Sequence, residues 1–301
     1  MVNRWWIYQH ERFPLLAHGP LVAAFSFSAV SFSSLLRGRV ALPDAGTALV
    51  AFVSALLFFL QLRIADEFKD HEEDARYRPY RPVPRGLVTL RELRVIGVAS
   101  ALVQLGLVLW WDPSLALLLA LVWLYLGLMS KEFFAREWLK ARPFTYMWTH
   151  MLIIPLIDLY ATACDWQATK ATAPTGLFWF LLVSFFNGIV VEIGRKIRAP
   201  QDEEPGVETY SVLWGRKNAV LAWLTALSLT AISAWQAARQ IGFATPVVAL
   251  LGVLLSAATL IAWRFLRQSV TQRARLFEPM SATWTLLMYL GLGAFPLLVG
   301  V

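Results

Sequence analysis

The sequence predicts an all-α, polytopic membrane protein with nine transmembrane helices. Hydrophobic residues make up 58% of the 301 residues and charged residues only 16%, which does not suit a water-soluble surface. Several apolar stretches also reach about 18 residues, the length that a helix needs to cross about 30 Å of hydrocarbon. A soluble protein is thereby excluded. No linker divides the chain, so we expect a single integral-membrane domain over residues 1–301.

The predicted elements follow in chain order. Residues 1–14 carry charges and aromatic rings but no apolar core with a cleavage signal, so an interfacial helix is expected there rather than a signal peptide. The nine apolar stretches lie at 15–36, 45–65, 92–111, 114–130, 144–163, 175–194, 218–237, 245–265 and 281–299.

Positive charge marks one side of the membrane. The connections on that side hold 23 of the 27 Lys and Arg residues, and the positive-inside rule assigns it to the cytoplasm. We therefore expect a multi-pass protein of a bacterial inner membrane, with the N-terminus in the cytoplasm and the C-terminus outside. The net charge of +7 reflects this topology, because the basic residues lie at helix ends. The lipid bilayer is an expected partner and nucleic acid is not.

Negative charge gathers where topology does not require it. Of the 20 Asp and Glu residues, 16 lie on the cytoplasmic side, and seven fall in the single connection from Asp66 to Glu92. Thiol and zinc chemistry offer no alternative site, because Cys164 is the single cysteine and no Cys and His spacing is typical of zinc. The acidic connection is therefore the first candidate site.

Three of these carboxylates recur at helical spacing. If the second helix continues, Asp66, Asp70 and Asp74 share one face, because residues four apart differ by only about 40° around the axis. Like charges at this spacing repel each other, so a neutralising cation is favoured. Mg²⁺ prefers hard oxygen ligands and binds through one or two carboxylates together with substrate phosphates. The cluster predicts Mg²⁺ and a phosphorylated substrate.

A proline-rich basic segment follows over residues 76–86. Its prolines end the regular helix and hold guanidinium groups beside the acidic face, where Arg78 and Arg81 are expected to bind diphosphate. The plainer alternative is that these acids and bases pair with one another in a solvated loop.

Together the acidic and basic residues resemble the first aspartate-rich motif of the UbiA-type intramembrane prenyltransferase superfamily, usually Asn-Asp-x-x-Asp-x-x-x-Asp with a downstream Arg-Pro. The matching residues are Asp66, Glu67, Asp70, Asp74, Arg78, Arg81 and Pro82. Asp66 and Glu67 replace the usual Asn and Asp but keep an oxygen ligand. The resemblance implies a UbiA-like bundle with a polar cap on the cytoplasmic side, and a metal site that includes all four acids.

The resemblance also implies a second motif, Asp-x-x-x-Asp, after the sixth helix. Glu192 fits its first position as a metal ligand, whereas Lys196 stands at the second and inverts the charge. An ionised Glu at the end of a membrane helix is costly without partners, and its alternative role is to pair with the neighbouring bases. Lys196 is expected to neutralise diphosphate in place of a second metal ion, with Arg195 and Arg198 as further donors. A site with one metal ion thereby becomes plausible, and the choice between one ion and two stays open.

Other polar residues form a secondary set. Asp202, Glu203 and Glu204 could fold back as ligands, although such a proline-flanked loop is more often solvated. Between the fourth and fifth helices, Ser130 and Lys131 are the nearest matches to residues that the family places over its cavity, and Lys131 is expected to bind diphosphate. The alternative for this connection is a basic interfacial helix.

Three residues of the fifth helix are not expected to act. His150 is expected to be a hydrogen-bonded core residue rather than a base. Asp158 and Asp165 lie toward the opposite face of the membrane, too far along the helix to join the metal site.

A cationic and acidic cap above an apolar bundle suits a substrate with a diphosphate head and a hydrocarbon tail. The resemblance implies a Mg²⁺-dependent prenyltransferase that ionises an allylic isoprenyl diphosphate and transfers the prenyl group to a lipophilic or aromatic acceptor. Two alternatives stay open. A UbiA-type terpene cyclase would need no acceptor, and a non-catalytic scaffold or transporter would use the charged loops for regulation or ion passage. Tail length, acceptor and oligomeric state are not encoded in these patterns.

Overall fold

The computed structural model of the chain describes residues 3–300, and these residues form helices and connecting turns without a β-strand. Eight segments are long and apolar enough to cross a membrane. They are α2 (Leu15–Leu36), α3 (Ala45–Lys69), α5 (Leu90–Trp111), a short 3₁₀ turn with α6 (Ala116–Ser130), α8 (Pro143–Met151) with α9 (Ile153–Trp166), α10 (Leu177–Gly194), α12 (Arg216–Gln240) and α13 (Ala244–Arg267). The protein is an all-helical, multi-pass integral membrane protein, as predicted.

The ninth predicted helix is divided into two pieces. It is present as α15 (Phe277–Leu292) and α16 (Ala294–Val299), with Gly293 between them. Pro296 has no N–H group to bond the carbonyl of Leu292, four residues earlier, so the regular helix cannot continue through this point. Gly293 also packs directly on α2, where a Cβ would come within 2.4 Å of the Ser28 Cα. Each piece is therefore shorter than the length that spans a bilayer by itself.

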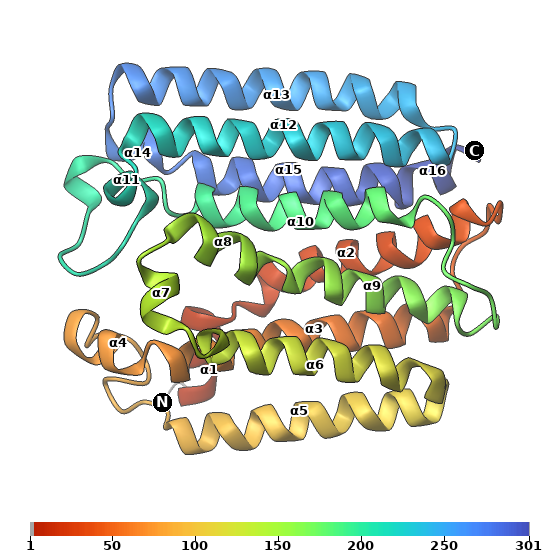
Figure 1. Ribbon diagram of the computed structural model, residues 1–301, viewed down its shortest axis with the longest axis horizontal. Coiled ribbons are helices and arrows are strands. Elements are labelled where there is room, and N and C mark those ends of the chain that lie inside the picture. Colours follow the sequence, from red (N-terminus) through yellow and green to blue (C-terminus); the bar gives the residue numbers. More distant parts are fainter. Residues whose placement is uncertain (1–2, 301) are drawn as a thin grey trace.

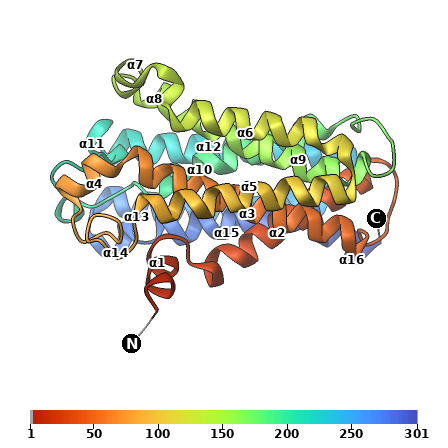
Figure 2. The same ribbon diagram turned by 90° about the horizontal axis from the view of Figure 1, so that it is seen from below.

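The long helices run side by side in a bundle (Figure 1). α10 packs against α12 and α15, whereas α3 packs against α5, and α2 and α9 lie in contact between these groups. The remaining short helices are α1 (Arg4–Arg12), α4 (His71–Tyr77), α7 (Arg136–Lys140), α11 (Tyr210–Leu213) and α14 (Thr271–Ala274). Figures 1 and 2 place α4, α7, α11 and α14 at one end of the bundle, which we call the polar cap.

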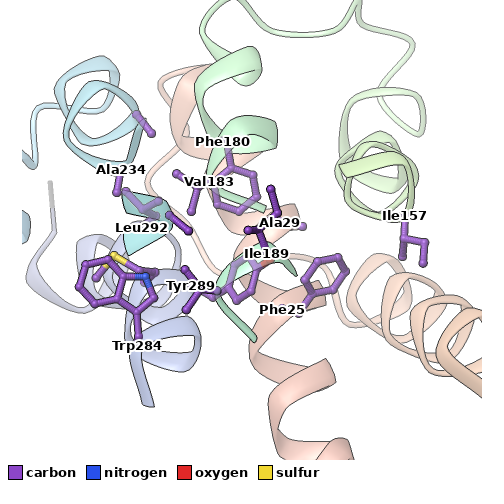
Figure 3. Packing of buried hydrophobic residues seen from close by; sticks show 14 of the residues in the cluster. Phe25, Ala29, Ile157, Phe180, Val183, Ile189, Ala234, Trp284, Tyr289 and Leu292 are labelled. Carbon is purple, nitrogen blue, oxygen red and sulfur yellow. The ribbon is translucent and has the colours of Figure 1, made fainter. Parts of the chain in front are cut away.

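Aromatic and aliphatic side chains fill the middle of the bundle (Figure 3). The ring of Tyr289 on α15 meets Phe25 of α2 edge-on, with 5.1 Å between centroids, and Phe180 of α10 at 6.1 Å. Phe180 also stacks on Phe32 at 4.5 Å. Burial of such rings, with their edge-to-face contacts, joins α2, α10 and α15 into one core.

The first helix of the polar cap continues α3. α3 ends at Lys69, four residues beyond its predicted end, and α4 begins at His71. The backbone bonds of a helix persist across this junction: Asp70 N–H donates to the Asp66 carbonyl at 2.9 Å, and Asp74 N–H donates to the Asp70 carbonyl at 2.8 Å. The three aspartates therefore keep the four-residue helical spacing that the sequence predicts.

Candidate functional site

Asp66 and Asp70 have weaker ionic contacts than the other two carboxylates of the first motif. Asp66 lies 3.5 Å from Arg63 Nη1 and 3.7 Å from Lys69 Nζ. Asp70 forms no ion pair with the residues that the structure describes. Burial raises the pKa of Asp70, and the Asp66 and Asp74 carboxylates raise it further against the opposing charge of Lys69. An ionised Asp70 is thus costly unless a cation joins it.

Asp74 forms ion pairs with two arginines. Its carboxylate is 1% exposed and lies 2.8 Å from Arg78 Nη2 and 2.6 Å from Arg81 Nη1. Acids and bases of the first motif therefore do pair here, but in a buried site rather than in a solvated loop. The pairing fixes the turn after α4, where Pro79 and Pro82 end the helix.

Glu67 points to a different face of α3. Its carboxylate is 2% exposed and pairs with Arg12 of α1, the interfacial helix that the sequence predicts. Adjacent residues of a helix diverge by about 100°, so Glu67 and Asp66 cannot face the same cation. Ligation by Glu67 remains a prediction that this pairing does not support.

The second motif is neutralised from within. Glu192, at the end of α10, accepts bonds from Arg195 and from Lys196, whose Nζ lies 2.8 Å from Oε1. Burial and the Glu192 charge raise the pKa of Tyr210, so its phenol stays protonated and donates to Glu192 Oε1 at 3.5 Å. Lys196 also lies over the Tyr210 ring, 5.4 Å from its centroid.

The two motifs face each other across the polar cap. The Glu192 carboxylate raises the pKa of Arg195, and the charge of Asp66 on α3 adds to this effect. Their loops also meet, because the Tyr80 hydroxyl donates to Glu204 at 3.2 Å. Gly206, with φ of +75°, packs so closely on Tyr77 that a Cβ would lie 2.4 Å from the ring. The two motifs thus belong to one polar cap, joined through the contacts of their loops.

The loop after α10 is stabilised by its own contacts. Arg198 donates to Glu204 at 3.1 Å, Asp202 accepts from Thr271 at 2.9 Å, and Glu203 accepts from Thr209 at 2.7 Å. None of these three acids contacts Glu192 in the described structure. The loop lines a cavity of about 470 Å³ together with Arg195, Arg198 and the start of α15.

The connection from α6 to α8 contributes residues other than those expected. Lys131 is exposed and Ser130 bonds only to the Gly127 carbonyl, so the structure brings neither into contact with the acidic motifs. Instead Tyr146 of α8 accepts a hydrogen bond from Lys69 Nζ at 2.9 Å and donates to buried Glu132 at 3.3 Å.

Sequence reasoning missed Tyr146, Glu132 and Tyr210 as parts of this site. They belong to no motif, and no four-residue spacing marks them. The signal that could have found Tyr210 is its position just after Thr209, which caps α11 and ends the second-motif loop. His150 is buried as predicted, 6% exposed, and its ring stacks on Tyr146 at 4.0 Å. Asp158 and Asp165 bond to Ser184 and to Ser33, away from both motifs.

The donor set fits one divalent cation rather than two. Within residues 3–300 no three His, Cys, Asp or Glu side chains converge as a complete metal site. The nearest basic atoms to Asp66 are Arg63 Nη1 at 3.5 Å and Lys69 Nζ at 3.7 Å, and Asp70, four residues later, forms no ion pair with the described residues. Mg²⁺ usually binds through one or two carboxylates, waters and substrate phosphates. These two residues match that pattern, whereas Asp74 and Glu192 already have basic partners.

A comparison of the sequence with protein families finds one match, to the UbiA prenyltransferase family over residues 26–292. No curated protein sequence matches the chain significantly.

Solved structures of low identity share the fold. The apo structure of a UbiA homologue from Aeropyrum pernix K1 superposes with a TM-score of 0.69 at 13% identity, covering 91% of this chain and 96% of that one. A digeranylgeranylglyceryl phosphate synthase gives 0.60 at 14% identity, covering 97% and 99%. A UbiA homologue from Archaeoglobus fulgidus, bound to GPP and Mg²⁺, gives 0.55 at 13% identity, covering 92% and 98%.

Proposed function

The chain belongs to the UbiA prenyltransferase family, and on this basis we propose that it is a Mg²⁺-dependent enzyme that transfers a prenyl group from an isoprenyl diphosphate to an acceptor within the membrane. The observation that carries the proposal is the juxtaposition in the polar cap. Asp66 and Asp70 of the first motif belong to the same polar cap as Arg195 and Lys196 of the second, because the loops that follow the two motifs are in contact. A diphosphate bridged to one divalent ion is complementary to both sides.

The named relatives support the ligand classes. The Archaeoglobus fulgidus homologue was solved with GPP and Mg²⁺, and the same homologue was solved with DMAPP and Mg²⁺. At such low identity these ligands are evidence for those proteins, and for this chain they indicate which substrates to test first.

In the proposed reaction Asp66 and Asp70 would hold Mg²⁺, which when bound supplies positive charge to the departing diphosphate. Lys196 and Arg195 would donate hydrogen bonds to the same diphosphate oxygens and so favour cleavage of the C1–O bond. Tyr210 keeps Lys196 in place through its ring and through Glu192. Arg78 and Arg81 hold the turn beside the site through Asp74 and are proposed as further contacts for the diphosphate.

The bundle would receive the hydrocarbon tail. Phe180 lies 12 residues before Glu192 on α10, about 18 Å deeper along the helix at about 1.5 Å per residue. Apolar walls at that depth exclude water, and aromatic faces stabilise positive charge on an allylic group. The acceptor is proposed to be lipophilic or aromatic, because it must reach carbon C1 of the prenyl group inside the apolar helix bundle.

The test is an assay of the purified protein with geranyl, farnesyl and geranylgeranyl diphosphate, with and without Mg²⁺. The acceptor probes are 4-hydroxybenzoate, 1,4-dihydroxy-2-naphthoate and glycerol 1-phosphate. The proposal expects Mg²⁺-dependent diphosphate release and a prenylated probe. Diphosphate release with a cyclic hydrocarbon and no prenylated probe would identify a terpene cyclase instead. No release with any diphosphate would favour a scaffold or transporter.

The orientation of the chain is a separate proposal. We propose that the polar cap lies in the cytoplasm of a bacterial cell, with the N-terminus on that side of the inner membrane and the C-terminus outside. The helices at the two chain ends, α1 and α16, lie at opposite ends of the bundle (Figure 1), which supports an odd number of crossings. Reporter fusions after α1 and after α16 should give opposite signals, and equal signals would reject this topology.

A further inference from the structure

His150 lies between the two acidic motifs although it belongs to neither. It is on α8, which packs against α10, and its side chain is 6% exposed. Its ring stacks on Tyr146, whose hydroxyl accepts a hydrogen bond from Lys69 of α3 at 2.9 Å, and the neighbouring α10 carries Glu192. The imidazole therefore borders the space in which the proposed diphosphate and acceptor would meet.

The hydrogen bond of the ring identifies which nitrogen carries the proton. His150 Nδ1 lies 2.8 Å from the backbone carbonyl oxygen of Tyr146. A carbonyl oxygen only accepts, so Nδ1 carries the hydrogen and Nε2 of the neutral ring carries a lone pair. Nε2 is buried and has no hydrogen-bond partner within residues 3–300. Buried polar atoms are usually satisfied by the fold, which makes this one a candidate for a ligand contact.

The ring is also held in one orientation. It stacks on the Tyr146 ring at 4.0 Å with an interplanar angle of 15°, and Phe133 meets it edge-on at 6.0 Å. Phe133 and its neighbours Glu132 and Phe134 all have left-handed backbone angles, with φ of 54°, 49° and 57°. Three such residues in succession are costly and persist only where surrounding structure imposes them. Here they place Phe133 against the ring of His150 and Glu132 against Tyr146.

Several other polar groups near His150 are already engaged. Glu192 accepts from Arg195 and Lys196, and Tyr146 bonds both Lys69 and Glu132. Asp66 and Asp70 are the proposed cation ligands. Of the four histidines, His150 is the buried one. Its Nε2 is therefore an unpartnered nitrogen with a lone pair that can take up a proton.

We propose that His150 Nε2 takes the proton that the acceptor loses on prenylation, and that the acceptor is accordingly a hydroxyl compound. In this step the acceptor O–H bond breaks and its proton moves to Nε2. The electron pair of that bond becomes available to the nucleophilic atom, which forms the new bond to C1 of the prenyl group. The C1–O bond to diphosphate breaks, and its electrons leave on the diphosphate. This assignment rests on the proposed function and adds to it the class of acceptor.

The first test separates ionisation from transfer. In His150→Gln the amide can still donate to the Tyr146 carbonyl but cannot take up a proton. With geranyl diphosphate, Mg²⁺ and the hydroxyl probe that the wild type prenylates best, we expect at least a hundredfold loss of prenylated product. The rate of diphosphate release by His150→Gln should change by less than about tenfold. Water would then capture the geranyl group, so geraniol should be the product. Unchanged transfer, or equal losses of transfer and release, would overturn the proposal.

His18→Gln is the matched control. His18 Nδ1 also bonds the carbonyl four residues earlier, Pro14, at 3.1 Å, but on α2, where its ring stacks on Phe13 and contacts neither Glu192 nor an aspartate of the first motif. This variant should transfer and release at wild-type rates.

A second test does not need activity. In protein labelled with ¹⁵N-histidine, with His150→Gln used to assign the resonances, His150 should show a proton-bearing Nδ1 and a proton-free Nε2. Adding Mg²⁺, geranyl thiolodiphosphate and the phenol probe should shift the Nε2 resonance. A proton on Nε2, or no shift, would reject the assignment. If the wild type prenylates no probe, the proposed function fails and these resonances decide the role of His150 separately.

Discussion

The carboxylates of the two acidic motifs in the polar cap differ in how their negative charge is neutralised. In the first, Asp70 forms no ion pair with the described residues, and the partners of Asp66 are 3.5 Å or more away. In the second, Glu192 is in contact with Arg195, Lys196 and Tyr210. On the proposed function, Asp66 and Asp70 are completed by a cation from outside the chain, whereas the cations beside Glu192 come from the chain itself.

On the proposed function, the difference predicts that the first motif holds the metal ion and that one ion is sufficient. A carboxylate at position 196 would repel Glu192 and require a second cation, but Lys196 removes that need. One divalent ion at Asp66 and Asp70, with permanent cations opposite, is the simplest arrangement that neutralises a diphosphate. Substitutions in each motif should therefore have different consequences.

The largest effect is expected from Asp70→Asn. Loss of this charge should reduce turnover by about a hundredfold or more, because stabilisation of the leaving group depends on the ion it would hold. Rates of diphosphate release at saturating Mg²⁺ measure it. Glu72→Gln is the matched control, since Glu72 is an exposed carboxylate on α4, two residues after Asp70. Full activity of Asp70→Asn would remove the metal site from the first motif.

Glu67→Gln should affect stability rather than chemistry. Breaking its buried pair with Arg12 should cost about 3–5 kcal/mol of unfolding free energy, because Arg12 keeps an uncompensated charge. Denaturant unfolding in detergent measures this loss, and a double-mutant cycle with Arg12→Gln isolates the pair. If the turnover of Glu67→Gln falls as far as that of Asp70→Asn while its stability is unchanged, Glu67 is a metal ligand. The assignment of a structural role to Glu67 is then wrong.

A smaller effect is expected at Lys196. Lys196→Gln should raise KM for the prenyl diphosphate about tenfold, the scale of one charge-assisted hydrogen bond. Lys196→Asp should restore an acidic pair with Glu192 and make activity depend on higher Mg²⁺ concentrations. Titrations of initial rate against Mg²⁺ distinguish the two variants. Identical Mg²⁺ dependence in wild type and Lys196→Asp would show that position 196 does not set the number of ions.

The smallest effect concerns the contact of α4 with α7. A hydrogen bond from Lys140 lowers the pKa of Glu73, with Arg136 nearby, so this contact stabilises the fold above the pKa of an unfolded Glu, about 4.3. The contribution is lost as pH falls through the lowered folded pKa. Because both partners are partly exposed, it should stay within about 1 kcal/mol. Between pH 5 and pH 3 the melting temperature of Glu73→Gln should fall slightly less steeply with pH than that of the wild type. An equal dependence of melting temperature on pH in both proteins would show that the contact is not formed.

Much of the bundle could be predicted from sequence because apolar length alone defines a span. The exception is 281–299, where a single proline, Pro296, and close packing of Gly293 on α2 interrupt an otherwise apolar stretch. A hydropathy profile contains no information about a missing N–H group or about contact with another helix. The spacing of Asp66, Asp70 and Asp74 was equally predictable, because helical periodicity is local.

Long-range pairing could not be predicted. The Arg12 to Glu67 pair joins residues 55 positions apart, and Tyr146 reaches Lys69 across 77 positions. No local pattern indicates which face of α3 meets α1 and which meets α8. Asp66 and Glu67 are neighbours in the motif, yet tertiary packing gives them different surroundings.

The account is tested most directly by calorimetric binding of geranyl thiolodiphosphate, which resists ionisation, to the purified protein. Binding is predicted to require Mg²⁺, to be lost in Asp70→Asn and to be retained in Glu72→Gln. Equal affinity without Mg²⁺, or wild-type affinity in Asp70→Asn, would contradict the claim that the first motif holds the cation of the diphosphate.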